Sequence, residues 1–230
     1  MEAKEKFEHN EVVDEGIRIA LNSIAAKYGS GDNDGERPKD YHNLMHTRDV
    51  LDAARSIAIE CFENGKIHLS DIPLVELAAA FHDVEQDLES GVNEKESARI
   101  AEEWMMRNGF TQDKINKVKQ MILATMVYFD DSGMFQSASD DILTQIICDA
   151  DLSTLGEETG VYYSDANGLF KEITHSDTHD EAYFKMQTPF YKNQVRLLTN
   201  HKYYTSEAGQ LYPKQSNNLD FAKELLTHLV

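Results

Sequence analysis

Apolar residues recur along most of this chain at intervals of three and four, which is the spacing of one buried face of an α-helix. Strict alternation of apolar and polar positions, typical of half-buried strands, is scarce, and no internal repeat interrupts the pattern. We therefore expect an all-α fold of the helical-bundle type. The pattern predicts helices over residues 12–28, 44–62, about 73–88, 93–108, 111 to about 128, 139 to about 156, 181–199 and 219–229.

We expect a single domain over residues 1–230, because no stretch has the composition of a linker between domains. Within it, a core of about 37–156 carries the motifs described below, and about 162–230 forms a helical C-terminal extension with more aromatic residues. A chain of this length is able to bury a sizeable core.

The charge is strongly acidic, with 41 Asp and Glu against 22 Lys and Arg and a formal net charge of −19. Because the acidic residues are spread along the chain, binding to duplex nucleic acid or to an anionic membrane surface is not expected. A small anionic molecule is still a suitable partner, since a bound metal reverses the field inside a cleft.

The chain has two cysteines, Cys61 and Cys148, which are too few for a disulfide framework. Both lie in apolar helical surroundings, where a free thiol behaves as a small hydrophobic group. Residues 1–10 are charged, and no apolar run approaches the roughly 20 residues of a membrane span. We expect a cytoplasmic protein in a reducing compartment.

Two features of the sequence indicate a metal site. His82 and Asp83 directly follow an apolar run over 73–81, and His46 shares the apolar face of the helix predicted over 44–62. Buried ionisable groups need a partner, and a divalent cation suits neutral imidazole beside carboxylate.

A further carboxylate is expected from Asp149-Ala150-Asp151, where the two acids flank a core-facing stripe on opposite sides. Periodicity does not separate these two candidates, and each also fits a solvated acid near a helix end. His42 precedes Asn43, the predicted N-cap of the next helix, and fits a surface or capping histidine better than a ligand.

Four segments, in order, resemble the HD superfamily of metal-dependent phosphohydrolases, and within it a bacterial group described only as predicted hydrolases. They are Tyr41-His42-Asn43-Leu44-Met45-His46, Phe81-His82-Asp83, Asn93-Glu94-Lys95-Glu96-Ser97-Ala98 and Asp149-Ala150-Asp151-Leu152-Ser153-Thr154-Leu155-Gly156. The resemblance implies an all-helical fold in which His46, His82, Asp83 and one acid of the last segment bind a divalent ion, and it favours Asp151.

The chain also departs from relatives in that superfamily. Many two-metal HD enzymes supply additional histidines after the His-Asp pair, whereas residues 121–131 contain none, so one metal ion is implied. Alarmone hydrolases carry Glu-Asp soon after that pair, whereas this chain has Gln86-Asp87, which argues against hydrolysis of guanosine tetraphosphate.

Two acids are candidates for the catalytic role in metal-assisted hydrolysis. Asp87 lies four residues after Asp83, and on one continuous helix it would orient or deprotonate the attacking water. A solvated acid in the last turn is the alternative. Glu94 is a second candidate, although an acid favoured by the dipole of the first helical turn explains it better.

Arg37 and Lys39 precede the first motif and are the nearest candidates for binding a phosphate, although each also fits an ordinary surface charge. His175 and His179 have ligand-like spacing, but they lie in a segment rich in turn and cap formers, so we do not expect a second metal site there.

These features predict a metal-dependent phosphohydrolase that acts on a nucleotide or another small phosphate ester or anhydride. A catalytically silent module that binds a nucleotide, or a helical protein whose metal fixes only the fold, would share the same ligands. The sequence leaves open the substrate, the native metal (Mn, Fe, Co, Ni, Zn or Mg) and whether the chain forms a homo-oligomer.

Overall fold

The computed structural model describes residues 11–30, 34–89, 91–130, 133–175 and 181–229. Within these residues the fold is all-α, with one small antiparallel hairpin, as the periodicity predicts. The helices are α1 (Glu11–Tyr28), α2 (Leu44–Glu63), α3 (Ile72–Phe81), α4 (Asn93–Arg107), α5 (Gln112–Ala124), α6 (Ile142–Asp151), α7 (Thr159–Thr174), α8 (Glu181–Asn200), α9 (Ser206–Leu211) and α10 (Gln215–His228). The strands are β1 (Val127–Asp130) and β2 (Gly133–Gln136), and short 3-10 helices cover Leu69–Asp71 and Ser153–Gly156.

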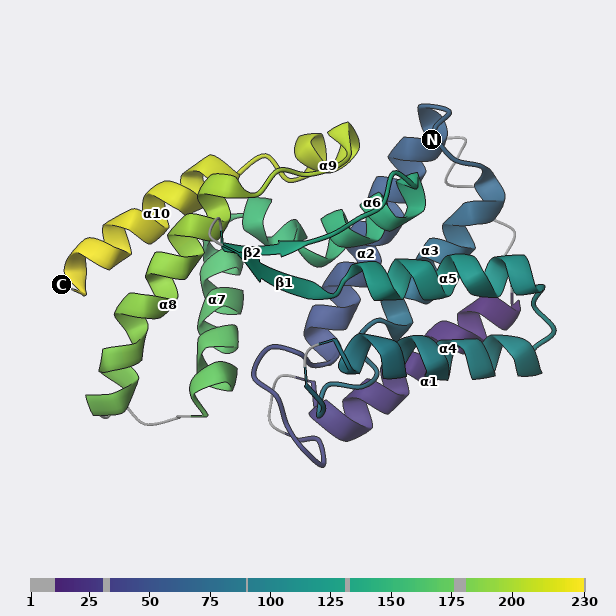
Figure 1. Cartoon of the computed structure of the whole chain (residues 1–230), viewed down its shortest axis with the longest axis horizontal. Helices are drawn as coiled ribbons and strands as arrows, with labels where there is room; N and C mark the ends of the chain where they lie inside the picture. Colours follow the sequence, from purple (N-terminus) through teal and green to yellow (C-terminus); the bar gives the residue numbers. More distant parts are fainter. Residues whose placement is uncertain (1–10, 31–33, 90, 131–132, 176–180, 230) are drawn as a thin grey trace.

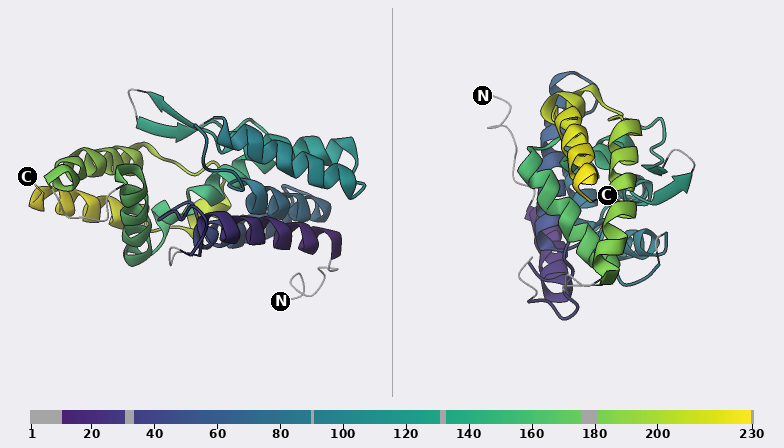
Figure 2. Two further views of the ribbon diagram at one scale, coloured as in Figure 1. Left: turned by 90° about the horizontal axis from the view of Figure 1, so that it is seen from below. Right: turned by 90° about the vertical axis from the view of Figure 1, so that its left-hand side faces the viewer.

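Helices α1 to α6 pack around one apolar core, with α3 in its middle (Figures 1 and 2). Every residue of α3 except Pro73 is buried, because its side chains are apolar on nearly all sides. Helix α1 approaches α4 closely at Gly16, where a Cβ would lie 2.4 Å from the ring of Trp104. The apolar core of the bundle therefore includes α1, which precedes the motif-bearing segment of about 37–156.

The last third of the chain forms a second group of helices beside this bundle (Figure 1). Helices α7, α8 and α10, with the segment after α6, enclose a separate apolar cluster that includes Tyr162, Ala166, Leu197 and Ala222. Helix α9 returns to the bundle and buries Ala208 in its core. The metal-ligand candidates lie on the bundle side of this junction, and α7 covers them from the other side.

The predicted helix over 73–88 is too long, since α3 ends at Phe81. No glycine or proline marks this end. The following backbone N–H groups are instead bound by side chains: Glu85 to Ser97, Gln86 to Tyr28, Asp87 to Glu85 and Leu88 to Asn93. Tertiary hydrogen bonds thus replace the helical ones that periodicity predicts.

The end of the next predicted helix is also wrong, because α5 stops at Ala124 and a hairpin follows. Val127 pairs with Gln136, and Tyr128 stacks on its cross-strand partner Phe135. The β-branched and aromatic residues of 127–129 favour a strand over a helix. Helices α7 and α9 were not predicted, although Tyr162, Ala166 and Phe170 of α7 are buried at helical spacing.

Two further findings concern the cysteines and the apolar character of the helices. Cys61 and Cys148 are buried free thiols in the structure. None of the helices formed by the described residues is both long and apolar enough to cross a bilayer.

Candidate metal centre

The candidate ligands are placed by the ends of three helices. His46 lies in the first turn of α2, which begins where Asn43 accepts hydrogen bonds from the backbone of Met45 and His46. His82 and Asp83 follow the last residue of α3, and Asp151 is the last residue of α6. Residues far apart in the sequence therefore meet where the ends of these buried helices converge.

These four side chains, the His–Asp cluster, bring two nitrogens and two oxygens together. His46 Nε2 lies 3.4 Å from Asp83 Oδ2 and 3.3 Å from Asp151 Oδ1. His82 Nε2 lies 3.2 Å and 3.4 Å from the same two oxygens. Donors held about 2.1 Å from one divalent ion lie about 3.0–3.4 Å from their neighbours in octahedral or tetrahedral geometry. The ligand atoms of His46, His82 and Asp83 all lie within 4.8 Å of one another and fit a single ion, whereas Asp151 contacts both imidazoles but does not belong to this group of three.

Two of these donor atoms have no hydrogen-bond partner among the described residues, namely His82 Nε2 and Asp83 Oδ2, and both are buried. The two atoms lie 3.2 Å from one another, which is the distance of an ion pair when His82 is protonated. His82 Nδ1 lies 2.7 Å from the carbonyl oxygen of Ala79, and donation of its proton there leaves the lone pair of Nε2 facing the cluster. A divalent cation would satisfy both atoms at once.

An amide side chain supports each carboxylate. Gln86 Nε2 donates to Asp83 Oδ1 at 2.6 Å, and Gln136 Nε2 donates to Asp151 Oδ2 at 2.5 Å. Asn93 in turn donates to Gln86 Oε1. In both carboxylates one oxygen is thus held by an amide and the other faces the two imidazoles, which is how supporting residues orient metal ligands.

The electrostatics of the cluster reflect the close approach of opposite charges. Burial alone would lower the pKa of His46, but contact with Asp151 and Asp83 raises it to about 9. Burial would raise the pKa of Asp83, yet His82 and His46 hold it well below its usual range. The buried carboxylates are therefore ionised, and they favour a positive charge between them.

The second acid of the Asp149-Ala150-Asp151 segment points elsewhere. Asp149 is fully buried and accepts hydrogen bonds from the backbone N–H groups of Tyr204 and Thr205 and from the Thr205 hydroxyl, at 2.7–2.8 Å. Burial raises its pKa to about 6, against the effect of these donors. Asp149 anchors the α8–α9 connection, so the geometry favours Asp151 as the fourth candidate ligand.

Asp87 does not share a helix face with Asp83, because α3 has already ended, and that part of the prediction is wrong. Its carboxylate forms an ion pair with Arg37 and accepts a hydrogen bond from Tyr28 at 3.3 Å. The guanidinium group of Arg37 is therefore paired with Asp87 and not with a group in the His–Asp cluster. The structure gives neither residue a place in the cavities beside the His–Asp cluster.

Glu94 and Lys39 also have local partners. Glu94 lies in the first turn of α4 and accepts a hydrogen bond from the backbone N–H of Gly91 at 2.7 Å, which is the helix-start role that we considered as the alternative. Lys39 lies 3.7 Å from Glu172 and near the ring of Tyr28. Their proposed roles in catalysis and substrate binding stay predictions without a supporting contact.

His42 contacts an acidic side chain of α7, which the sequence did not indicate. Its Nδ1 lies 2.8 Å from Glu172 Oε1 of α7, and Glu172 Oε2 accepts from the backbone N–H groups of Tyr41 and His42. These contacts, against the effect of burial, lower the pKa of Glu172 to about 2. Helix α7 approaches this loop closely at Gly168, where a Cβ would lie 2.7 Å from the carbonyl oxygen of Asp40.

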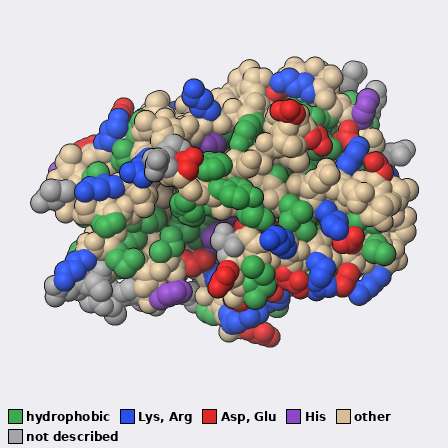
Figure 3. Space-filling model, viewed as in Figure 1, with side chains coloured by type: hydrophobic (Ala, Val, Ile, Leu, Met, Phe, Trp, Pro, Cys, Tyr) green, Lys and Arg blue, Asp and Glu red, His purple; other side chains and the backbone are tan. Residues whose placement is uncertain are grey.

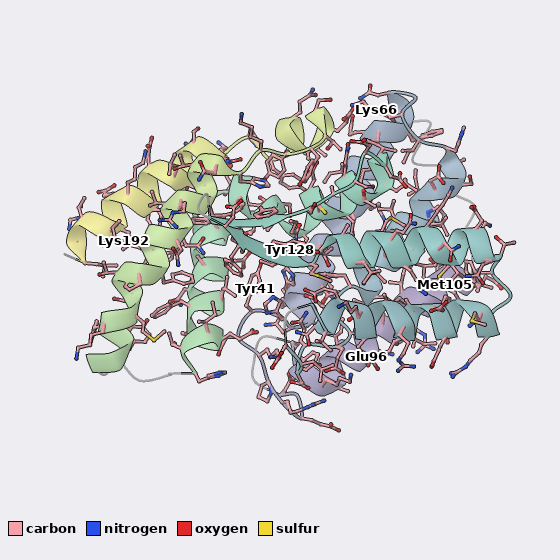
Figure 4. All side chains as sticks on the ribbon, in the orientation of Figure 1. Tyr41, Lys66, Glu96, Met105, Tyr128 and Lys192 are labelled. Atoms are coloured by element: carbon pink, nitrogen blue, oxygen red, sulfur yellow. The ribbon has the colours of Figure 1, made fainter. Side chains whose placement is uncertain are left out.

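Two cavities adjoin the cluster. The apolar cavity, of about 340 Å³, reaches Tyr41, His42, Gln136 and Asp151 and is otherwise lined mainly by apolar side chains of α7, α8 and the hairpin. The acidic cavity, of about 450 Å³, reaches His46 and includes Asp40, Asp49 and Asp165. Tyr41 separates α7 from the bundle helices and lines both cavities (Figure 4).

Sequence reasoning missed Gln86, Gln136, Glu172 and Asp165. Gln86 is three residues from Asp83, so its proximity was detectable, but the others come from the hairpin and α7, which were not predicted. Of the pair considered for a second metal site, His175 ends α7 with a left-handed backbone (φ 50°), and His179 lies outside the described residues.

In comparisons with models of known protein families and with curated proteins, no match to this chain was found. The likeness to the HD superfamily therefore depends on the four quoted sequence segments, and membership of that family stays a prediction.

Proposed function

We propose that this protein is a metal-dependent phosphohydrolase that cleaves a small phosphate ester with water. The observation that carries the proposal is the convergence of His46, His82, Asp83 and Asp151, in which two buried ligand atoms contact only other members of the cluster and have no hydrogen-bond partner among the described residues. The order of these residues along the chain also resembles that of HD phosphohydrolases. When bound, a divalent ion supplies Lewis-acid polarisation of a phosphoryl oxygen and lowers the pKa of water.

In this proposal the His42–Glu172 pair handles the proton. With its Nδ1 proton donated to Glu172, His42 has a lone pair on Nε2 that accepts a proton from the attacking water. The departing alkoxide leaves from the opposite side of phosphorus as the P–O bond breaks and takes its proton from solvent, and the ring returns its own proton to solvent. Glu172 orients the imidazole, in the same way that a carboxylate orients the histidine of a catalytic triad.

The His–Asp cluster contributes rigidity. Gln86 and Gln136 fix the carboxylates, and the carbonyl of Ala79 fixes the His82 ring, so the donor set needs little rearrangement during the reaction. Because the cluster is buried, water reaches it by way of the two cavities that adjoin it.

The test is a phosphate-release assay with phosphate esters and added Mn, Fe, Co, Ni, Zn or Mg. We expect turnover in the native protein and its loss in His82→Ala and Asp151→Asn. The matched control is His228→Ala, which removes an exposed histidine from the last turn of α10. The proposal is wrong if no ester is hydrolysed with any metal, or if His82→Ala turns over at the native rate.

A metal-dependent binding module without turnover is the second candidate. It is favoured by one observation, that no Lys or Arg of the described residues lines either cavity, although these side chains commonly clamp phosphate in hydrolases. Ligand-dependent thermal stabilisation without phosphate release would identify this second function.

A further inference from the structure

We infer that the substrate of this centre is a phosphate monoester of an apolar alcohol, bound with its apolar group in the cavity beside Asp151, and not a nucleoside polyphosphate. The inference rests on the proposed function and narrows its substrate class. Three features of the described residues carry it: the lining of the apolar cavity, the hydrogen bonds of its polar groups and the distribution of charge around the cluster.

The apolar cavity is the right size and in the right place. Its volume of about 340 Å³ lies within the range of about 300–1,000 Å³ of small-molecule sites. Asp151 and its partner Gln136 form part of its wall, so a group inside it lies directly beside the His–Asp cluster. The remaining wall is dominated by apolar side chains, among them Val127, Met134, Ala166, Leu169, Ile173 and Leu197.

Several polar groups in this wall already have partners within the protein, although Gln136 Oε1 has none among the described residues. Thr154 donates to Asp165 at 2.7 Å, and Tyr162 donates to Gln194 Oε1 at 3.3 Å. Gln136 Nε2 is shared between Asp151 and the carbonyl oxygen of Thr125. A nucleobase and a ribose would lose many hydrogen bonds to water on entering and would find few free groups besides Gln136 Oε1 to replace them, whereas an apolar group loses none.

The charge around the cluster disfavours a substrate that carries several phosphate groups. Neither cavity is lined by Lys or Arg from the described part of the chain, and the acidic cavity presents Asp40, Asp49 and Asp165. The nearest predicted phosphate binders, Arg37 and Lys39, contact Asp87 and Glu172 instead. Asp83 and Asp151 already offset the charge of one divalent ion, so every phosphate group beyond the one that the ion binds would add repulsion between like charges.

An exposed aromatic side chain lies at this cavity. Phe129 of β1 lines it and is 76% exposed. In the space-filling view, hydrophobic side chains gather in the middle of the face over the hairpin and α7 (Figure 3). An apolar substrate group that covers Phe129 would remove apolar surface from water, which is favourable.

The test compares three phosphates with the same metal: naphthyl phosphate, glycerol phosphate and adenosine triphosphate. We expect kcat/KM for naphthyl phosphate to exceed that for each of the others at least about tenfold, since hydrophobic pockets discriminate by about 10–200-fold per methylene. Ala166→Phe, which fills the cavity, should lower the ratio of kcat/KM for naphthyl phosphate over glycerol phosphate by a similar factor. Leu169→Phe serves as a second variant, and unchanged metal content shows that either variant is folded.

The outcomes separate this inference from the proposed function. Equal or faster hydrolysis of glycerol phosphate or adenosine triphosphate overturns the substrate class, while the hydrolase proposal stands. If none of the esters is cleaved, calorimetric titration with naphthylmethylphosphonate decides. Binding that Ala166→Phe abolishes supports the cavity as an apolar site without turnover, and failure to bind overturns both.

Discussion

Gln136 Nε2 lies 2.5 Å from Asp151 Oδ2, so the hairpin holds one oxygen of a carboxylate whose other oxygen faces His46 and His82. Gln86 holds Asp83 in the same way from the segment after α3. Gln86 and Gln136 thus fix the orientation of the two acidic candidate ligands. Removing either amide side chain should lower the affinity for the metal.

Gln86→Ala should weaken metal binding by about 10–100-fold, the usual effect of losing a residue that supports a ligand. The reason is that Asp83 Oδ1 loses its amide donor and the carboxylate becomes free to rotate. Competition with a chelator measures the change. Gln112→Ala is the control, because it removes an exposed amide of α5 that bonds to Asn116. Equal affinity in the two variants would show that Gln86 does not support the metal.

Asp149→Asn and Asp151→Asn should affect different properties, the first the stability of the fold and the second the binding of the metal. Asp149→Asn places an amide against three donors from Tyr204 and Thr205 and should lower the free energy of unfolding by about 1–3 kcal/mol, with the metal retained while the protein is folded. Asp151→Asn should lose the metal instead. Chemical denaturation and elemental analysis of both variants check this, and metal loss confined to Asp149→Asn would reverse the assignment.

His42→Asn should lower kcat by about 10²–10⁴-fold, the usual contribution of a general acid or base, with metal content unchanged. Glu172→Gln should also lower kcat, but by a smaller factor, because it affects only the orientation of the His42 ring. Asp87→Asn is the comparison, since its carboxylate is paired with Arg37. If Asp87→Asn loses activity and His42→Asn does not, the sequence-based role of Asp87 is restored.

Glu207 should make the stability depend on pH. Burial would raise its pKa, but Lys66 and Asn64, each 2.7 Å away, lower it to about 2. Because the pKa is depressed on folding, this contribution is fully present above the unfolded value near 4.5 and is lost as the pH falls towards 2. Because the Lys66 side chain is 39% exposed, solvent screens this ion pair, and the contribution amounts to about 1 kcal/mol at neutral pH.

Urea denaturation of the native protein and Glu207→Gln measures this contribution. We expect the native protein to be more stable at pH values near 7 and the difference to shrink below the ordinary Glu pKa of about 4.3. A difference that stays constant down to pH values near 3 would mean that the carboxylate charge does not contribute.

The sequence predicts the all-α fold and the buried positions of His46 and His82 because helical periodicity depends on local spacing. It failed where tertiary contacts replaced local ones. Helix α3 ends at Phe81 because side chains from other segments bind the following backbone N–H groups, so Asp87 was placed on the wrong element.

Periodicity also left the choice between Asp149 and Asp151 open, since both flank the same stripe of α6. The distinction depends on the α8–α9 connection, whose backbone binds Asp149, and on Gln136 of the hairpin, which binds Asp151. Neither element was predicted to be there, because the short strands and α9 are too brief to give a periodic signal.

The most direct test of the account is the metal content of the purified protein, measured by elemental analysis on native chain, His82→Ala, Asp83→Ala and the control His228→Ala. The account predicts about one divalent ion per chain in the native protein and in His228→Ala, and loss of that ion in the two cluster variants, with all four folded by circular dichroism. A native protein that holds no ion after incubation with any of the six metals, or a His82→Ala variant that retains it in full, would contradict the central claim.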